Sequence, residues 1–562
     1  MSIRNILRAG VFAAAFFGAA AASAQSGPPS QASSSGGDEP VLEEGIDRER
    51  APRQRRRPRL DVQPYVELNA GVSADLSGEG DGDVLTYSSV AAGVDGRVQT
   101  QRVTAQASYR YDRQIVIDGE GGDTDSHSGI AAVHVEAAPG ISLDAGALAT
   151  RTGGAGRSVA LSPRDQTSQL YSAYVGPTLQ TQIGALSLGA SYRLGYVALD
   201  DDGLAGDPFG DRLDDAIAHN ATASIGMGAG NGRVPFGWTV GGGYVRSESG
   251  DLDNVFEAAY IRGDVVVPVS PTLALTAGVG YENIDASQSD VLRDANGVPI
   301  VMGGRLVRDP NAPRLTGFDS DGIIYDGGII WRPNPRTELQ ARAGRRYGGT
   351  TVTGSLRHQF RRGVALNASV YDSVGNSATA IVSNIDDLPA NFQTNRNPLT
   401  GAFEGCVFGE DPGTGVCFDQ ALQSLGNSAF RARGASLFLS GRRGLWTFGA
   451  GAGYQHQRYT DLVSGDLSSI DPRTDQSFSL NASASRRLSR YSGVSLDGVA
   501  SWYDSDRAFF APVFSSGVTG SYYRTLFMER LQFHAALGIF YTDTGLIDST
   551  VASALVGLRY NF

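Results

Sequence analysis

The sequence contains no lysine, so all 47 of its basic residues are arginine. This excludes a Walker phosphate-binding loop, a Schiff-base lysine and a lysine general base. After residue 24 it also lacks any apolar run of about 18 residues, which excludes a helical inner-membrane protein. Its net charge of -12 disfavours a nucleic-acid partner, which would require a segregated basic face.

Glycine is what the chain has in excess. It supplies 73 of 562 residues, nearly double the roughly 7% of ordinary proteins. Hydrophobic residues make up 41%, which is slightly low for a large packed core. This composition argues against a large α/β enzyme.

The first 24 residues have the features of a secretory signal peptide. Arg4 and Arg8 precede an apolar stretch over residues 9–22, and the small residues Ala22 and Ala24 suit a signal peptidase. We therefore expect residues 1–24 to be a signal peptide that is cleaved before Gln25.

Residues 25–59 are rich in Ser, Gly, Pro and charge, which predicts a disordered periplasmic tail. Its arginine run either contacts anionic lipid headgroups or a periplasmic partner, or belongs to a solvated linker. With about 35 residues the tail is too short to form the folded plug of a TonB-dependent receptor. The arginines of this run are Arg53, Arg55, Arg56, Arg57 and Arg59.

From Leu60 onward, stretches of about 10 to 15 residues alternate apolar and polar side chains, as β-strands do. The last stretch is the clearest, and only Leu555 breaks its polar face. Its apolar face carries Ala552, Ala554, Val556, Leu558, Tyr560 and Phe562, and its polar face carries Ser553, Gly557, Arg559 and Asn561.

Short and long connections tend to alternate between these stretches, as in outer-membrane barrels with short periplasmic turns and long external loops. We count about 22 strands, an even number that places both termini in the periplasm. Only Tyr347–Thr350 is ambiguous between a tight turn and a bulge. The predicted fold is all-β, a transmembrane antiparallel β-barrel over residues 60–562 in the cell outer membrane of a Gram-negative bacterium.

Aromatic residues gather at the strand ends next to the long loops, as in the girdles at membrane interfaces. A soluble β protein can also place aromatics there. The predicted girdle comprises Tyr109, Tyr111, Tyr192, Tyr196, Tyr244, Tyr281, Tyr371, Tyr454, Tyr459, Trp502, Tyr503 and Tyr541.

The closing residues Leu558, Tyr560 and Phe562 resemble the C-terminal signal that the bacterial barrel assembly machinery recognises. In addition, residues 64–67, 85–94 and 108–113 look like the opening hairpins of barrels associated with exopolysaccharide systems. This second resemblance implies a role in polysaccharide secretion, with polysaccharide or periplasmic secretion components as partners.

No catalytic, cofactor or metal site is predicted, because the six histidines are scattered and no nucleophile motif is present. Alternation directs six arginines into the lumen, where guanidinium groups bind anionic solutes or uronate-bearing sugars, or instead pair with lumenal carboxylates. These lumen candidates are Arg110, Arg193, Arg342, Arg346, Arg357 and Arg559.

Two loop features complete the prediction. The acidic loops around residues 75–83, 118–125 and 200–202 either share Ca²⁺ or Mg²⁺ with lipopolysaccharide or are simply solvated. The stretch from Gly375 to Ser428 is long enough to fold over or into the barrel mouth as a constriction. It contains Cys406 and Cys417, which fit an oxidising compartment and either close a small disulfide loop or are two unpaired thiols.

The expected function is porin-like transport: passage of polar solutes or exopolysaccharide across the outer membrane with no chemical step. Two alternatives stay open. One is a structural or assembly barrel that binds a surface glycan or partner through its external loops, and the other is an outer-membrane hydrolase. Expected partners are outer-membrane lipid, lipopolysaccharide and the assembly machinery.

Overall fold

The computed structural model describes most of the chain from Arg59 onward, with short gaps. The described ranges are 59–77, 84–119, 122–153, 167–200, 213–230, 234–250, 252–302, 305–361, 363–393, 396–403, 405–423, 425–459, 474–506, 511–527, 530–545 and 548–562. The predicted signal peptide and all but the last residue of the predicted tail lie outside these ranges.

The barrel wall consists of 22 strands. The first half comprises β1 (Arg59–Asp75), β2 (Val84–Gln99), β3 (Val103–Asp118), β4 (Thr124–Ala138), β5 (Ile141–Gly153), β6 (Thr167–Ile183), β7 (Leu186–Asp200), β8 (Asp215–Met227), β9 (Gly237–Ser249), β10 (Asn254–Ser270) and β11 (Leu273–Gln288). The second half comprises β14 (Leu315–Asn334), β15 (Thr337–Arg346), β16 (Gly349–Arg361), β17 (Val364–Gly375), β21 (Phe430–Arg443), β22 (Trp446–Tyr459), β23 (Thr474–Arg487), β24 (Ser492–Ser505), β25 (Val513–Leu526), β26 (Leu531–Asp543) and β27 (Asp548–Asn561).

The remaining elements lie in two connections. One holds the hairpin β12 (Val301–Met302) and β13 (Arg305–Leu306). The other holds α2 (Ser377–Asp386), β18 (Phe392–Gln393), β19 (Cys406–Gly409), β20 (Gly415–Cys417) and α3 (Asp419–Leu422). No helix among the described residues is long and apolar enough to span a membrane.

Each wall strand pairs antiparallel with the next, and β1 pairs with β27 to close the barrel, from Tyr65 opposite Asn561 to Asp75 opposite Val551. The predicted 22-strand antiparallel barrel is therefore confirmed. The ambiguous Tyr347–Thr350 segment is a tight turn: Tyr347 and Gly348 have φ values of 54° and 69°, and β16 begins at Gly349.

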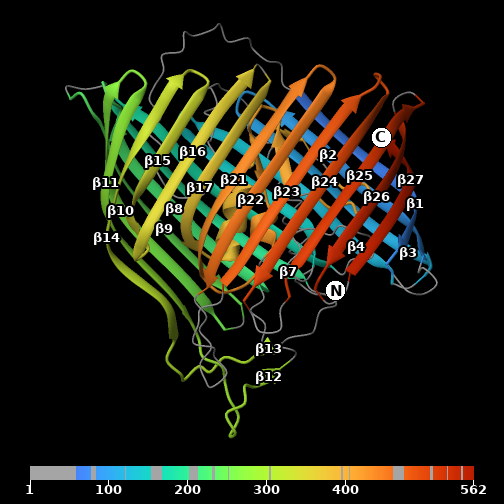
Figure 1. Ribbon diagram of the computed structural model, residues 1–562, viewed down its shortest axis with the longest axis horizontal. Coiled ribbons are helices and arrows are strands. Elements are labelled where there is room, and N and C mark those ends of the chain that lie inside the picture. The colour runs from blue at the N-terminus through green and yellow to red at the C-terminus, as the bar shows by residue number, and fades with distance from the viewer. Residues whose placement is uncertain are drawn as a thin grey trace.

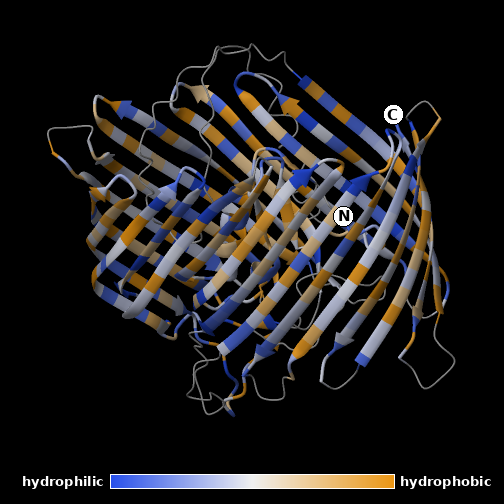
Figure 2. Cartoon of the chain, turned by 45° about the horizontal axis from the view of Figure 1, so that its top comes forward, coloured by the Kyte–Doolittle hydropathy of each residue, from blue (hydrophilic) through white to orange (hydrophobic). Residues whose placement is uncertain are grey.

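Hydrophobic and hydrophilic residues alternate along many of the strands (Figure 2), and successive side chains of a strand point to opposite faces of the wall. In β27, Val556, Leu558 and Tyr560 are exposed on the outside, whereas Ser553 and Leu555 are buried on the inside. A closed barrel leaves no unpaired strand edge, so it can present apolar side chains to lipid at no hydrogen-bonding cost. The protein is an outer-membrane barrel, and its outer face contacts membrane lipid.

The two ends of the barrel differ. The C-terminus lies at the top of Figure 1, at the end where the connections are short. The hairpin of β12 and β13 projects from the opposite end, which carries the long connections. By the rule for bacterial barrels, the short-turn end faces the periplasm and the long-loop end faces outward.

The predicted aromatic girdle needs a correction. Tyr371, Tyr459 and Tyr503 point into the lumen, where Tyr459 is fully buried and Tyr503 donates a hydrogen bond to Asp475. A position near a strand end does not reveal the face, which only the register decides. Tyr192, Tyr196, Tyr244, Tyr281 and Tyr454 are exposed on the outside, and a second outward row at the short-turn end comprises Trp331, Phe360, Trp446, Tyr560 and Phe562.

The connection between β17 and β21, residues 376–429, runs inside the barrel instead of over it (Figure 1). We call this segment the plug. Since it leaves and re-enters the wall at the long-loop end, it fills the lumen from the outer side. The sequence alternatives, over the mouth or into it, are thus resolved in favour of the lumen.

Candidate functional site

The plug is a folded unit with its own secondary structure. Asn376 caps the N-terminus of helix α2: its side chain accepts a hydrogen bond from the Thr379 backbone N–H, while the Thr379 hydroxyl oxygen accepts one from the Asn376 N–H. This reciprocal capping satisfies two backbone donors that a helix start leaves open. Strands β18, β19 and β20 form a small antiparallel sheet, and α3 follows directly after β20.

One apolar face of α2 packs on the inner wall. Ile381, Val382 and Ile385 are buried against residues of β4 to β8, among them Leu148 and Val197. Fully burying a side chain of this size contributes roughly 1.5–3 kcal/mol relative to leaving it exposed. The plug therefore has one strongly apolar contact region, on the β4–β8 side of the lumen.

A sequence feature of β4 and β5 predicts this contact region, although the search for alternating strands does not detect it. In β4 and β5, residues 129–133 and 145–149 are Gly, Ala, Ile, Leu or Val without interruption, so both faces of these strands are apolar there. A barrel strand with a water-filled lumen has a polar inner face. Continuous apolar runs of this kind therefore mark the strands whose inner face is covered by protein.

A stripe of inward glycines on β22 lets the plug approach the opposite wall. A Cβ atom on Gly451 would lie 2.5 Å from both sulfur atoms of the plug disulfide, and one on Gly453 would lie 2.5 Å from the Gln420 amide. A Cβ on Gly449 would collide with the Phe408 ring. Gly449, Gly451 and Gly453 thus form the contact surface on which β19, β20 and α3 lie.

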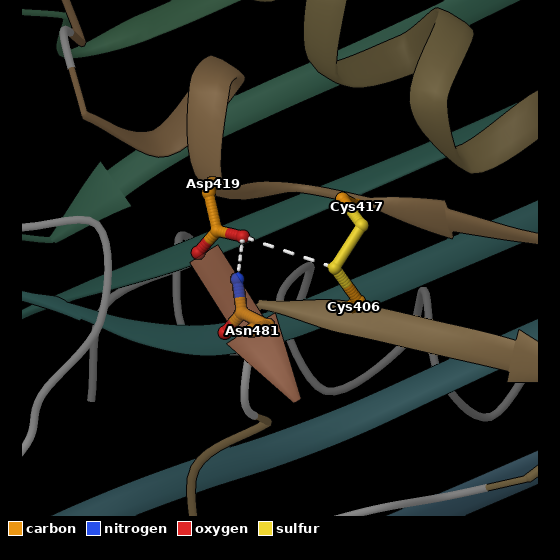
Figure 3. Close-up of a disulfide and its surroundings, with 4 residues drawn as sticks. All are labelled: Cys406, Cys417, Asp419 and Asn481. Carbon is orange, nitrogen blue, oxygen red and sulfur yellow. Dashed lines mark hydrogen bonds between the residues drawn. A yellow bond between two sulfur atoms is a disulfide. The ribbon is translucent and has the colours of Figure 1, made fainter. Parts of the chain in front are cut away.

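Cys406 and Cys417 form a disulfide that joins the paired strands β19 and β20 (Figure 3). Beside it, Asn481 of β23 donates a hydrogen bond from Nδ2 to Asp419 Oδ2 at 2.5 Å, and the Cys406 sulfur lies 4.0 Å from the same oxygen. Asp419 is 1% exposed. The disulfide and this buried hydrogen bond fix the plug sheet against β22 and β23.

Polar contacts tie the rest of the plug to the wall. Gln106 of β3 exchanges two hydrogen bonds with the backbone of Phe392, donating to its carbonyl at 2.6 Å and accepting from its N–H at 3.0 Å. Arg193 of β7 donates from Nε to Asp386 Oδ1 at 2.9 Å. Arg97 of β2 makes a bidentate pair with Glu410, at 2.7 and 2.9 Å.

A second apolar contact explains the irregularity in the last strand. Leu555, the one apolar residue on the polar face of β27, is buried in a cluster with Leu399 of the plug and Phe540 of β26. Neighbouring Gly538 would meet Leu399 if it carried a Cβ. Leu555 is therefore a plug contact.

All six predicted lumen arginines lie on the inner side of the wall, and five of them pair with carboxylates. Arg110 pairs with Glu67 and Asp112, and Arg559 with Asp95 and Glu67. The other three pairs are Arg193 with Asp144 and Asp386, Arg342 with Asp264 and Asp326, and Arg346 with Glu282. The sixth arginine, Arg357, lies opposite Glu338 in the register of β15 and β16.

One of these pairs belongs to a buried four-membered network. Arg262 and Arg342 converge on Asp264 and Asp326, with four N···O distances between 2.6 and 3.2 Å. Two cations and two anions balance, which offsets the cost of removing each from water. These groups stiffen the wall at β10, β14 and β15 and leave little charge there for a solute.

On the β16 wall the inward side chains are open to solvent. Ser355 and Arg357 are exposed although the register places them on the same face as Thr353 and Asn367. They contrast with the inner face of β4 to β8, which the plug buries. The plug is therefore seated asymmetrically within the barrel.

A cavity of about 480 Å³ lies between the plug and the wall near the short-turn end. Arg396 and Glu410 of the plug line it, together with Tyr65, Arg110 and Arg559 of the wall. The Arg396 guanidinium donates to the Tyr65 hydroxyl at 3.4 Å and to the Ser128 carbonyl at 3.0 Å. The cavity wall is thus polar, aromatic and of mixed charge.

The histidines are spread over the wall in separate contacts. His134 Nδ1 lies 2.6 Å from Asp144, His358 Nδ1 lies 2.8 Å from the Thr337 hydroxyl, and His534 Nε2 lies 2.9 Å from the Asn69 oxygen. Within the part of the chain that the structure describes, no three His, Cys, Asp or Glu side chains form a metal-binding group.

The acidic loops lie only partly in the described ranges. Asp123 and Asp125 pair with Arg113, at 3.5 and 3.2 Å. Glu79, Asp81, Asp83, Glu120, Asp201 and Asp202 lie outside the described residues. Divalent cation binding at these loops stays a prediction.

A scan against protein-family models finds no match, and a search of curated proteins finds no relative. Among solved structures, the chain is similar to the FrpB iron transporter from Neisseria meningitidis in its apoprotein form, with 12% identity, a TM-score of 0.43 and coverage of 89% of this chain and 81% of that chain. It is also similar to FpvA of P. aeruginosa bound to a pyoverdine, with 11% identity, a TM-score of 0.44 and coverage of 89% and 72%.

A third similar structure is the ferric-catecholate import receptor Fiu from E. coli K12 in its open form, with 8% identity, a TM-score of 0.43 and coverage of 89% of this chain and 81% of that chain. None of these three is an exopolysaccharide barrel, so that resemblance stays a prediction. At such low identity and TM-score the likeness carries no functional argument. The chain itself forms a 22-strand outer-membrane barrel with an internal plug.

Proposed function

We propose that the protein passes a polar solute across the outer membrane through its lumen, without a chemical step, and that the plug closes this path at rest. The observation that carries the proposal is the plug itself: a folded segment inside the lumen, continuous with the wall at both ends. A barrel needs no such segment for closure, because β1 and β27 already pair.

The contacts of the plug suit an element that can move. Its links to β2, β3 and β7 are side-chain hydrogen bonds and ion pairs, including those of Arg97, Gln106 and Arg193. Water can replace partners of this kind at a cost of about 1 kcal/mol each. The apolar contact of α2 with β4 to β8 and the contact of β19, β20 and α3 with β22 and β23 hold the plug at two places, and movement is expected where the remaining links are polar.

The wall chemistry defines the class of solute. Because five of the six lumen arginines pair with carboxylates, the lumen offers both donors and acceptors and does not select strongly for anions. Neutral or mixed-charge hydrophilic solutes fit this surface, and sugars are one such class. Exopolysaccharide passage is the finer form of the proposal and requires the plug to move far enough to admit a polymer.

The test is single-channel conductance of the refolded mature protein in a planar bilayer, compared with a variant in which a short Gly-Ser linker replaces residues 377–428. We expect the full chain to be closed or to open rarely and the deletion variant to conduct steadily. Liposome swelling with sugars of increasing size then measures the width of the path. Silence of the correctly folded deletion variant would contradict a conducting lumen.

A second candidate function is a structural or assembly barrel that binds a partner outside the cell. It is favoured by the hairpin of β12 and β13, which projects beyond the long-loop end (Figure 1) and exposes Val301 and Met302 at 36% and 68%. Silence of both proteins in the bilayer, with binding of a surface glycan or protein that depends on residues 291–308, would support it. The hydrolase alternative predicts turnover of a lipid or glycan that is lost on substitution of one histidine.

A further inference from the structure

Three consecutive short turns at the periplasmic end carry a dense group of arginines. The turns join β21 to β22, β23 to β24 and β25 to β26, so they are neighbours around the rim. We call this group the basic rim. Its members, all exposed, are Arg442, Arg443, Arg486, Arg487, Arg490, Arg524 and Arg530.

Three of these arginines face outward, toward the membrane. Arg443 pairs in register with Trp446, and Trp446 pairs with Arg486, so all three share one face. That face is the outer one, because Tyr454 on the same side of β22 is exposed whereas Gly449, Gly451 and Gly453 on the other side meet the plug. Arg524 pairs with Phe533, which in turn pairs with Leu558 on the outer face of β27.

Aromatic and apolar side chains accompany the arginines at the same level. The Arg486 guanidinium lies 5.3 Å from the centre of the Trp446 ring, and that of Arg490 lies 5.7 Å from the Tyr491 ring. The turns also expose Leu445, Leu488 and Phe527, the last at 82%. Trp and Tyr side chains mark the headgroup level of a bilayer, so these turns lie within the membrane interface.

The three turns that carry the basic rim contain few acidic residues. Residues 441–446, 486–493 and 524–530 contain seven arginines and one acidic residue, Glu529, which lies outside the described residues. Arg442 also acts electrostatically on Glu410 of the plug, from the lumen side. Guanidinium groups at this density repel one another unless an external anion balances them.

We propose that the basic rim binds anionic phospholipid headgroups of the periplasmic leaflet. A guanidinium group matches a phosphodiester through two parallel N–H···O bonds, and the aromatic rings beside it pack on the glycerol and upper acyl region. Attraction of arginine clusters to anionic lipid at a membrane surface is a general effect. An acidic periplasmic protein fits less well, because Arg443, Arg486 and Arg524 point sideways into the bilayer and not down into the periplasm.

This interaction is independent of solute passage, because it concerns the outer surface of β21 to β26 and not the lumen. Lipid binding there anchors one sector of the rim, whereas the described residues of the short turns between β4 and β11 include no comparable group of arginines. The expected result is a layer of tightly held anionic lipid on that sector.

The test is native mass spectrometry of the detergent-solubilised full chain, titrated with phosphatidylglycerol or phosphatidylcholine of equal chain length. We expect phosphatidylglycerol to bind at least tenfold more tightly. The variant Arg443→Gln/Arg486→Gln/Arg490→Gln/Arg524→Gln is expected to lose this preference. The corresponding four Arg→Lys changes keep the charge without the two-point geometry and are expected to retain part of it.

The matched control replaces four arginines near the long-loop end, Arg113, Arg246, Arg308 and Arg433, by Gln, and its lipid preference is expected to stay within twofold of that of the wild type. Heat-modifiable migration verifies that each variant is folded, and single Arg→Gln changes serve if the quadruple variant fails to fold. Equal binding of both lipids by the wild type, or an unchanged preference in the rim variant, overturns the proposal. Binding of a soluble acidic protein to the basic rim in place of the lipid also overturns the proposal.

Discussion

Arg193 of the barrel wall and Asp386 at the end of helix α2 form an ion pair of 2.9 Å between Nε and Oδ1. Arg193 also reaches Asp144 on β5 at 3.1 Å, so one guanidinium joins the plug to two strands of the wall. Removing the Asp386 carboxylate therefore leaves Arg193 paired with Asp144.

Replacing Asp386 by Asn is therefore expected to loosen the plug and leave the wall intact. The Asp386 side chain is 33% exposed, so the loss is about 1 kcal/mol, or roughly a fivefold rise in open probability. Single-channel recording measures it. Asp411→Asn, on an exposed carboxylate of the same plug, is the control and should behave as the wild type does.

Adding one methyl group at Gly451 is expected to displace the plug from β22. The new Cβ would lie 2.5 Å from both disulfide sulfur atoms, and overpacking of this kind costs roughly 1–3 kcal/mol. Limited proteolysis should cut the plug of Gly451→Ala faster than that of the wild type. Gly498→Ala is the comparison, because the nearest atom to its Cβ, the Gly517 carbonyl oxygen, is 3.9 Å away. Equal cleavage of the two variants would contradict a close contact between the plug and β22.

Removing the disulfide is expected to destabilise the plug alone. Cys406 and Cys417 are 11 residues apart in sequence, and closing a loop of this size stabilises by roughly 2–3 kcal/mol. Hydrogen exchange in Cys406→Ala/Cys417→Ala should rise in residues 405–423 and stay unchanged in β10 and β11. Dithiothreitol should raise exchange in the wild type but not in this variant.

Acid is expected to loosen the plug through Glu410. The hydrogen bond from Arg97 lowers the pKa of the Glu410 carboxyl below its ordinary value. A carboxylate with a lowered pKa stabilises the folded state above its unfolded pKa of about 4.3, and this contribution is lost as the pH falls through the lowered value. The contribution of this pair is thus complete above roughly pH 5 and disappears in stronger acid.

Conductance between pH 7 and pH 3 measures this dependence. Glu410→Gln removes the group that titrates, so its opening at pH 7 should already exceed that of the wild type and should respond less to acid. An identical acid response in the two proteins would assign the effect to other carboxylates.

Much of the wall was predictable because a barrel strand repeats every two residues and its turns have distinct composition. The predicted count of about 22 strands agrees with the 22 strands of the wall, and the clearest predicted stretch, from Ala552 to Tyr560, lies in β27. The long Gly375–Ser428 connection was also visible as a candidate constriction. The predicted girdle failed at Tyr371, Tyr459 and Tyr503, because alternation near a strand end does not show which face is inside.

The sequence by itself determined the architecture: an even number of alternating strands and a lumen lined by arginine. Only the tertiary structure decided that residues 376–429 fill the lumen, that Leu555 and the glycines of β22 form their seat, and that five lumen arginines are paired. The physical reason is distance along the chain. Strand pattern is local, whereas Arg193 and Asp386, or Leu399 and Leu555, meet only after the barrel closes and the plug folds inside it.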